Sequence, residues 1–322
     1  EGRVVFESAQ KVVVRVGSRE REIATAEVAE VKSAARNLRA ALERWEQIHA
    51  QDAAAIAELA RTCKEQGLEG EAQLFALGAL AVDPALEGAH ELLGHERRDG
   101  KWRVREGSKA FTYAELLELR RDFKDGWHLT TTHFDVRTNL APAQAVAAVL
   151  ELEFCYRTFF EWFGEAVELY EVVEPMLAQI HADKRSYPGG DERRGFYDPG
   201  LNTLFIDASS SLELPTLAHE AAHEVLINTA VKTRAGRGEI PPWLNEGLAQ
   251  YLEFSRSGEA GRPRYSKGAP EKRLFALHAQ AKKPFDLSRV LALATEDFTY
   301  SSRVQVTYAQ SYTLVHYCLH GE

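Results

Sequence analysis

The sequence predicts an α+β fold: a small mixed sheet with helices, preceded by short strands and a helical hairpin. Two observations predict it. Apolar, mostly β-branched residues recur at every second position near the N-terminus, as at Val12, Val14 and Val16, which is typical of strands. Further along, apolar residues recur every three to four positions over long stretches, which indicates amphipathic helices.

Composition excludes several classes of protein. The net charge of -9 argues against a nucleic-acid-binding protein, which needs a basic surface. No run of 18 or more apolar residues occurs, so we expect no membrane-spanning helix. The three cysteines include no C-x-x-C pair, which excludes a disulfide framework and a thiolate zinc cluster.

The 322 residues exceed the usual size of one domain, and the patterns divide them into three segments. Residues 1–50 combine the N-terminal strands with one helix and carry no catalytic signature. Residues 51–126 contain a helical hairpin and a charged connector, and residues 127–322 are expected to form one α+β domain. The strands of that domain are expected at 129–136, 167–173 and 201–207, and its first long helix at 141–163.

The hairpin of the second segment is similar to a tetratricopeptide repeat. Two helical patterns, 52–66 and 69–82, meet at Gly67, and Leu93-Gly94 begins a partial second unit. This resemblance implies a surface for a protein partner, and a plain helical scaffold is the alternative. The small, apolar and proline positions that match the repeat are Leu59, Cys63, Gly67, Ala72, Ala79 and Pro84.

An H-E-x-x-H motif, His219 to His223, lies on a predicted helix that begins after Ser211. Residues four apart share one face of a helix, so both imidazoles can reach a single Zn²⁺ ion. Glu220 is displaced by about 100° around the axis and can reach a water molecule held by that ion. The alternative is a polar helix face with two hydrogen-bonded histidines.

A second motif offers a third ligand, which catalytic zinc requires. Residues 241–251, P-P-W-L-N-E-G-L-A-Q-Y, predict a helix that is entered through two prolines. Glu246 lies 23 residues after His223, which leaves room for a loop and a returning helix. Gly247 allows close approach of another helix.

H-E-x-x-H followed by W-L-N-E-G-x-A resembles the gluzincin zinc metallopeptidases. In that clan the glutamate of N-E-G is the third zinc ligand, which implies one zinc ion held by His219, His223 and Glu246, with Glu220 as the general base. A closer resemblance, over most of the chain, is to uncharacterised bacterial peptidase-MA-like proteins. It is carried by the two metal motifs and more weakly by residues 195–197, G-F-Y. This resemblance and the start at Glu1 favour an exported bacterial protein cut from a longer precursor.

The chain departs from the aminopeptidase branch of the gluzincins. The loop between the two motifs is longer and basic, with Lys232, Arg234 and Arg237. No G-x-M-E-N-like segment occurs, which in that branch captures the free amine of the substrate. We therefore expect endopeptidase action, or action on a narrow unknown substrate, rather than trimming from the N-terminus.

Tyr308 is the candidate for stabilising the oxyanion. Residues 308–312, Y-A-Q-S-Y, are similar to the Y-E-K-G segment whose tyrosine has this role in gluzincin aminopeptidases. A phenol hydroxyl that donates to a developing oxyanion is worth about 3 kcal/mol. Tyr312 is the alternate, and a structural tyrosine is the other interpretation.

Two functions are compatible with these motifs. The first is a zinc metallopeptidase acting on a peptide or protein, in which Glu220 takes a proton from the zinc-activated water and passes it to the leaving amine. In this hypothesis the strand at 201–207 is an exposed edge that pairs with the substrate. The second is a non-catalytic zinc-binding scaffold that recruits a protein partner through its helical segment.

Overall fold

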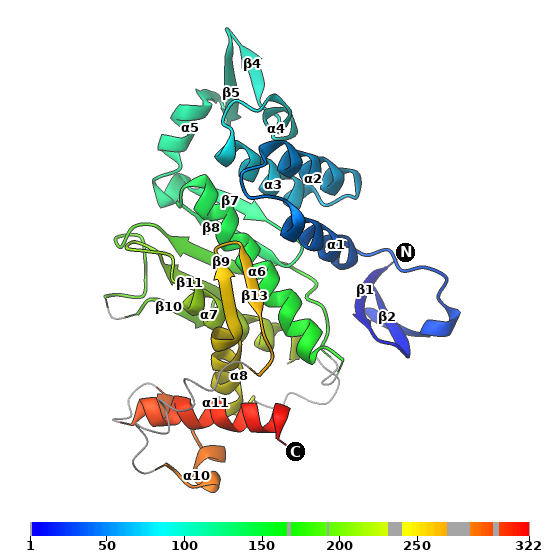
Figure 1. Ribbon diagram of the computed structural model, residues 1–322, viewed down its shortest axis with the longest axis vertical. Helices are drawn as coiled ribbons and strands as arrows, with labels where there is room; N and C mark the ends of the chain where they lie inside the picture. The colour runs from blue at the N-terminus through cyan, green and yellow to red at the C-terminus, as the bar shows by residue number, and fades with distance from the viewer. Residues whose placement is uncertain are drawn as a thin grey trace.

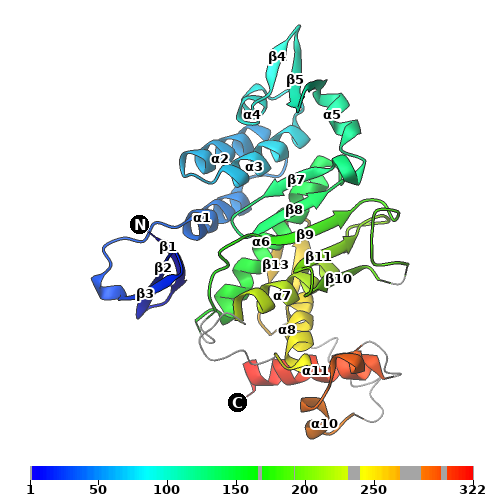
Figure 2. The same ribbon diagram turned by 180° about the vertical axis from the view of Figure 1, so that it is seen from behind.

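The computed structural model describes residues 2–165, 169–191, 193–230, 240–268, 284–298 and 303–321. Within these ranges the chain is α+β and has four small sheets. Figures 1 and 2 show a long molecule, with the helical hairpin towards one end, the largest sheet in the middle and the C-terminal helices at the other end.

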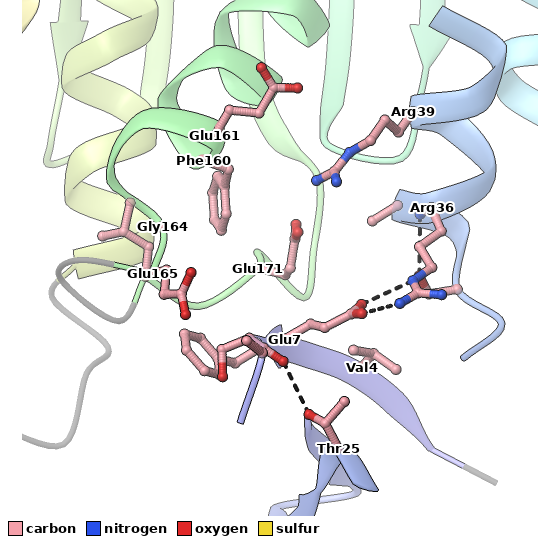
Figure 3. Close-up of a pocket in the computed structure, with 16 residues that line it drawn as sticks. Val4, Glu7, Thr25, Arg36, Arg39, Phe160, Glu161, Gly164, Glu165 and Glu171 are labelled. Carbon is pink, nitrogen blue, oxygen red and sulfur yellow. Dashed lines mark hydrogen bonds and ion pairs between the residues drawn. The ribbon is translucent and has the colours of Figure 1, made fainter. Parts of the chain in front are cut away.

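The N-terminal unit is an antiparallel sheet of three strands, as the alternation predicted. Phe6 stacks on Tyr170, and Glu171 N–H donates to Val5 O at 2.8 Å, so the unit is attached to the segment after the longest helix. A cavity of about 600 Å³ lies at this junction (Figure 3), with Glu7 bound to Arg36 on one side. The strands are β1 (Arg3–Glu7), β2 (Lys11–Val16) and β3 (Arg19–Ala24).

The helical segment consists of one antiparallel hairpin and two flanking helices. Its turn is at Gly67, whose φ of 76° is one that L side chains rarely adopt. The expected second repeat is limited to one short helix, because the chain then enters a three-stranded sheet of order β4-β5-β6. The elements are α1 (Ala34–Gln47), α2 (Ala53–Glu65), α3 (Glu69–Val82), α4 (Glu87–Leu92), β4 (Glu96–Arg98), β5 (Lys101–Glu106), β6 (Lys109–Thr112) and α5 (Tyr113–Leu119).

The central sheet is mixed, with the order β10-β11-β9-β8-β7. The β8-β9 and β9-β11 pairs are parallel, and the two outer pairs are antiparallel. Two long helices cover one face, where they pack against each other, α6 on β8 and α7 on β10 and β11. The elements are β7 (Trp127–Thr130), β8 (Phe134–Thr138), α6 (Pro142–Phe163), β9 (Met176–His181), β10 (Gly195–Asp198), β11 (Thr203–Asp207) and α7 (Leu214–Ala230).

Three strand predictions need correction. The strand expected at 129–136 is a hairpin of β7 and β8, because the turn between them is held by Glu71, which accepts from Thr132 N–H at 2.7 Å. The strand expected at 167–173 is not found: residues 169–175 form no strand, and residues 166–168 are outside the described residues. The strand of this region is β9, which follows Pro175. The third strand, β11, lies inside the sheet, so the edge strand beside α7 is β10, whose residues are half-buried.

The C-terminal helices complete the molecule at the end away from the hairpin (Figure 1). Gly247 allows α8 and α11 to touch, since a Cβ atom there would lie 2.6 Å from Ser311 O. No described helix combines the length and the apolar character needed to cross a membrane. The elements are α8 (Pro242–Ser255), β12 (Arg256–Glu259), β13 (Arg262–Tyr265), α10 (Leu287–Leu291) and α11 (Val304–His320).

Candidate metal centre

The helix α7 presents His219 and His223 on one face, one turn apart. The opposite face is held in the core by Leu217, Ala221 and Val225, which are all fully buried. Buried apolar residues at these spacings fix the rotation of the helix, so the two imidazoles turn towards α8. The centroids of their rings lie 4.8 Å apart.

The helix α8 brings Glu246 to the two imidazoles. His219 Nε2 and His223 Nε2 are 3.2 Å apart, and they lie 3.6 and 3.5 Å from Glu246 Oε2. Two ligand atoms bound at 2.1 Å to a tetrahedral ion lie about 3.4 Å apart, so the triangle has the size that zinc requires. No described group donates a hydrogen bond to Glu246 Oε2. A buried carboxylate oxygen without a donor suits a cation.

Outer hydrogen bonds orient both imidazoles. His219 Nδ1 lies 3.0 Å from Glu253 Oε2, and His223 Nδ1 lies 2.9 Å from Asn245 Oδ1. Because an amide oxygen only accepts, the Nδ1–H of His223 donates outward, and its Nε2 is the ring atom that faces the triangle and can bind a cation once it is deprotonated. The sequence analysis missed these two residues. The available signals were that Asn245 adjoins Glu246 and that Glu253 follows it by two helical turns.

The imidazoles and the carboxylate of the triangle stabilise each other in their charged forms. Burial opposes a charged imidazole, but the nearby carboxylates of Glu246 and Glu253 outweigh it and raise the pKa of His219 to about 10. Burial likewise opposes the carboxylate of Glu246, but the charge of His223 and the proximity of both imidazoles lower its pKa to about 2. The buried carboxylate of Glu246 is therefore stabilised by the positive charge of the protonated imidazoles. A divalent cation that displaces the protons from the imidazoles supplies positive charge in their place.

Glu220 is bound through one carboxylate oxygen to the edge strand of the sheet. Its Oε2 accepts a hydrogen bond of 3.1 Å from the backbone N–H of Tyr197 on β10. Gly195 makes this approach possible, because a Cβ atom there would lie 3.1 Å from Glu220 Cγ and 3.0 Å from Thr216 Cγ2. The carboxylate is thus held between the edge strand and the helix that carries both histidines.

The structure distinguishes the two candidate tyrosines on α11. Tyr312 is fully buried, and its ring packs on Tyr251 and Phe254. Tyr308 is half-buried against Phe298. Burial raises the pKa of the Tyr308 phenol, and the negative charges of the nearby site carboxylates raise it further. The Tyr308 phenol is therefore within electrostatic range of the candidate site. Those carboxylates are Glu246, Glu220 and Glu253.

The basic residues of the intervening loop, Lys232, Arg234 and Arg237, lie outside the described residues. Among those described, His219, His223 and Glu246 are the one group of three histidine, cysteine or acidic side chains whose ligand atoms converge, within 4.8 Å of one another.

One family model, described as a protein of unknown function (DUF1570), matches residues 213–322. The matched segment contains all five candidate residues of the site and does not extend to the helical hairpin or the central strands. No curated protein and no solved structure matches the chain.

Proposed function

We propose that this protein is a zinc-dependent metallopeptidase that hydrolyses internal peptide bonds. The observation that carries the proposal is the convergence of His219, His223 and Glu246 next to a tethered carboxylate, Glu220. Two imidazoles and one carboxylate are a common ligand set of catalytic zinc. Zinc bound there would lower the pKa of a water molecule to about 7 and polarise a substrate carbonyl.

The other residues have roles that follow from their positions. Glu220 accepts the proton of the attacking water and delivers it to the leaving nitrogen. The bond from Tyr197 N–H limits the rotation of this carboxylate, so it is already oriented when the substrate binds. The Tyr308 hydroxyl, whose high pKa keeps it protonated, donates to the carbonyl oxygen as negative charge develops there.

The substrate lies along β10 in this proposal. The sheet ends at β10 within the described chain, and an edge strand can pair with an extended peptide. The same strand holds Glu220 through Tyr197, so a peptide paired with it lies beside the general base. This replaces β11, which the sequence analysis had assigned to that role.

The test combines metal analysis with peptide cleavage. Protein purified without chelating resin is analysed for metal by mass spectrometry, then incubated with a library of internally quenched peptides. We expect about one zinc per chain and cleavage that stops with a chelator and returns with added zinc. Wild-type protein that takes up no zinc after reconstitution would contradict the proposal.

Glu220→Gln separates catalysis from metal binding. The amide keeps the volume of the side chain and does not remove a ligand, so zinc content is expected to stay near one per chain. Peptide hydrolysis is expected to fall by about 100- to 10,000-fold, the usual contribution of a general base. If wild-type protein holds zinc but cleaves no peptide, the alternative is favoured, a zinc-binding scaffold that recruits a partner through α2 and α3.

A further inference from the structure

Two consecutive arginines precede β10, and they differ in their partners. Arg194 Nη1 lies 2.8 Å from Ser210 Oγ and 3.5 Å from the buried carboxylate of Asp207. Arg193 is exposed, and within the described ranges no hydrogen bond or ion pair engages its guanidinium, which lies 5.9 Å from the centroid of the Phe196 ring. Arg194 is therefore part of the fold, while the donors of Arg193 are engaged by no residue of the described ranges.

The register of β10 places the free backbone groups close to Arg193. Asp207 N–H donates to Arg194 O at 2.8 Å, so Arg194 bonds towards β11. In an antiparallel ladder the next residue faces the other way, so Gly195 and Tyr197 direct their backbone groups to the open edge. Tyr197 N–H is already bound to Glu220. A peptide on this edge therefore pairs with Gly195, towards the end of the strand where Arg193 lies.

Arg193 is also close to the candidate reaction centre. It precedes Gly195 by two residues, which is about 7 Å of extended chain, and Gly195 contacts Glu220. Its charge also acts on the Tyr308 phenol, opposite in sign to the three site carboxylates. The guanidinium of Arg193 therefore lies at the rim of the candidate site, beside the path of a peptide bound along β10.

We propose that Arg193 binds a carboxylate of the substrate and makes this enzyme selective for acidic peptides. The inference rests on the proposed peptidase function and identifies its substrate class. A guanidinium recognises a carboxylate by two parallel hydrogen bonds, which neither a glutamine nor a lysine side chain can accept in the same way. The carboxylate belongs either to an aspartate or glutamate side chain or to the C-terminus of the peptide.

The test uses quenched peptides built on one sequence that the wild-type protein cleaves. Each position from three before to three after the cleaved bond carries glutamate, glutamine or lysine in turn, and each peptide is made with a free or an amidated C-terminus. The kcat/KM values are compared for wild type, Arg193→Gln and Arg264→Gln. Arg264 is exposed on the β12–β13 hairpin, so its variant controls for the loss of one positive charge.

We expect wild type to prefer glutamate over glutamine by about tenfold at one position, with a smaller preference at high salt. Arg193→Gln is expected to reduce that ratio to about twofold or less, and Arg264→Gln to keep it. If the ligand is the C-terminal carboxylate, amidation produces the tenfold loss instead. Equal cleavage of all peptides, or a uniform loss in Arg193→Gln, overturns the inference alone. Cleavage of none by wild type overturns the proposed function as well.

Discussion

Two clusters of histidine and glutamate lie in this molecule, and they differ in how their polar atoms are used. In the buried cluster around His133, Glu153 accepts from His133 Nδ1 at 2.6 Å and from Thr131 Oγ1 at 2.5 Å, and Glu171 accepts from Tyr156 at 2.7 Å. In the metal cluster, Glu246 Oε2 accepts no hydrogen bond from any described residue. We call the first cluster the closed network because its carboxylates accept these hydrogen bonds, although His133 Nε2 has no hydrogen bond to a described residue and only lies 3.3 Å from Glu171 Oε2, and we call the second cluster the open triangle.

The difference shows which property identifies a site. The carboxylates around His133 are satisfied by nearby donors, as buried polar groups usually are, and such a network stabilises the fold. Around Glu246 the outer hydrogen bonds hold the imidazoles, and the three inner atoms face one point. Convergence of three ligand atoms that includes a buried carboxylate oxygen without a donor is the feature that separates this candidate metal site from a structural cluster.

The largest effect is expected from a substitution that removes a ligand of the open triangle. Glu246→Gln removes the one anionic ligand, so zinc is expected to fall to less than about a tenth of an ion per chain. Peptide hydrolysis is expected to fall by about a thousandfold or more, since no activated water remains. Metal analysis, cleavage assays and circular dichroism check this outcome. A variant that keeps a full zinc complement would show that Glu246 is not a ligand.

A substitution in the closed network around His133 is expected to lower the stability of the protein and to leave zinc binding unchanged. Glu153→Gln leaves the buried charge of His133 without its strongest partner, which costs about 3–5 kcal/mol of the free energy of unfolding. The folded fraction is expected to keep its zinc. Urea unfolding measures the loss, with Glu161→Gln as the control, because Glu161 is exposed on the same helix. A loss below about 1 kcal/mol would mean that the network is not closed as described.

The sequence predicted the helices well and the strands less well, for physical reasons. Helical periodicity is local, so the hairpin expected at 52–66 and 69–82 differs from α2 and α3 by at most one residue at any end. The strand expected at 129–136 failed because a distant carboxylate, Glu71, holds the turn that splits it, and no local pattern contains that contact.

The site shows the same division between local and distant information. The spacing of His219 and His223 on one helix is a local property, and the sequence was sufficient for it. The bonds from Glu253 and Asn245 depend on how α7 crosses α8, which the sequence alone does not determine. Arg193 and Arg194 are adjacent and alike in the sequence, and the partners of Arg194 and the register of β10 were needed to separate them.

The closed network is expected to make stability depend on pH. Burial opposes the charged ring of His133, but Glu153 and Glu171 outweigh it and raise its pKa to about 9, from 6.5. Because the folded state binds the proton more tightly, this contribution is fully present below pH 6.5 and is lost as the pH rises towards 9. The expected loss of unfolding free energy over that range is on the order of 3 kcal/mol.

Chemical unfolding at several pH values measures this loss. Zinc-saturated protein is used, so that the imidazoles of the metal cluster do not titrate over the same range. His133→Gln is expected to be less stable than wild type at pH 6.5 but to show a flatter profile. Parallel profiles for the two proteins would assign the pH dependence to other groups.

The smallest expected effect concerns the support of the triangle. Glu253→Gln keeps a hydrogen-bond acceptor near His219 Nδ1 but removes the negative charge, so it weakens the ligand without removing it. Loss of an outer partner of a zinc-bound histidine typically reduces metal affinity by about 10- to 100-fold. Zinc titration against a competing chelator measures this change, and unfolding experiments check that stability is kept. Asn245→Asp adds charge at His223 and is expected to strengthen binding instead, so equal affinities in both variants and wild type would show that these bonds only pack the helices.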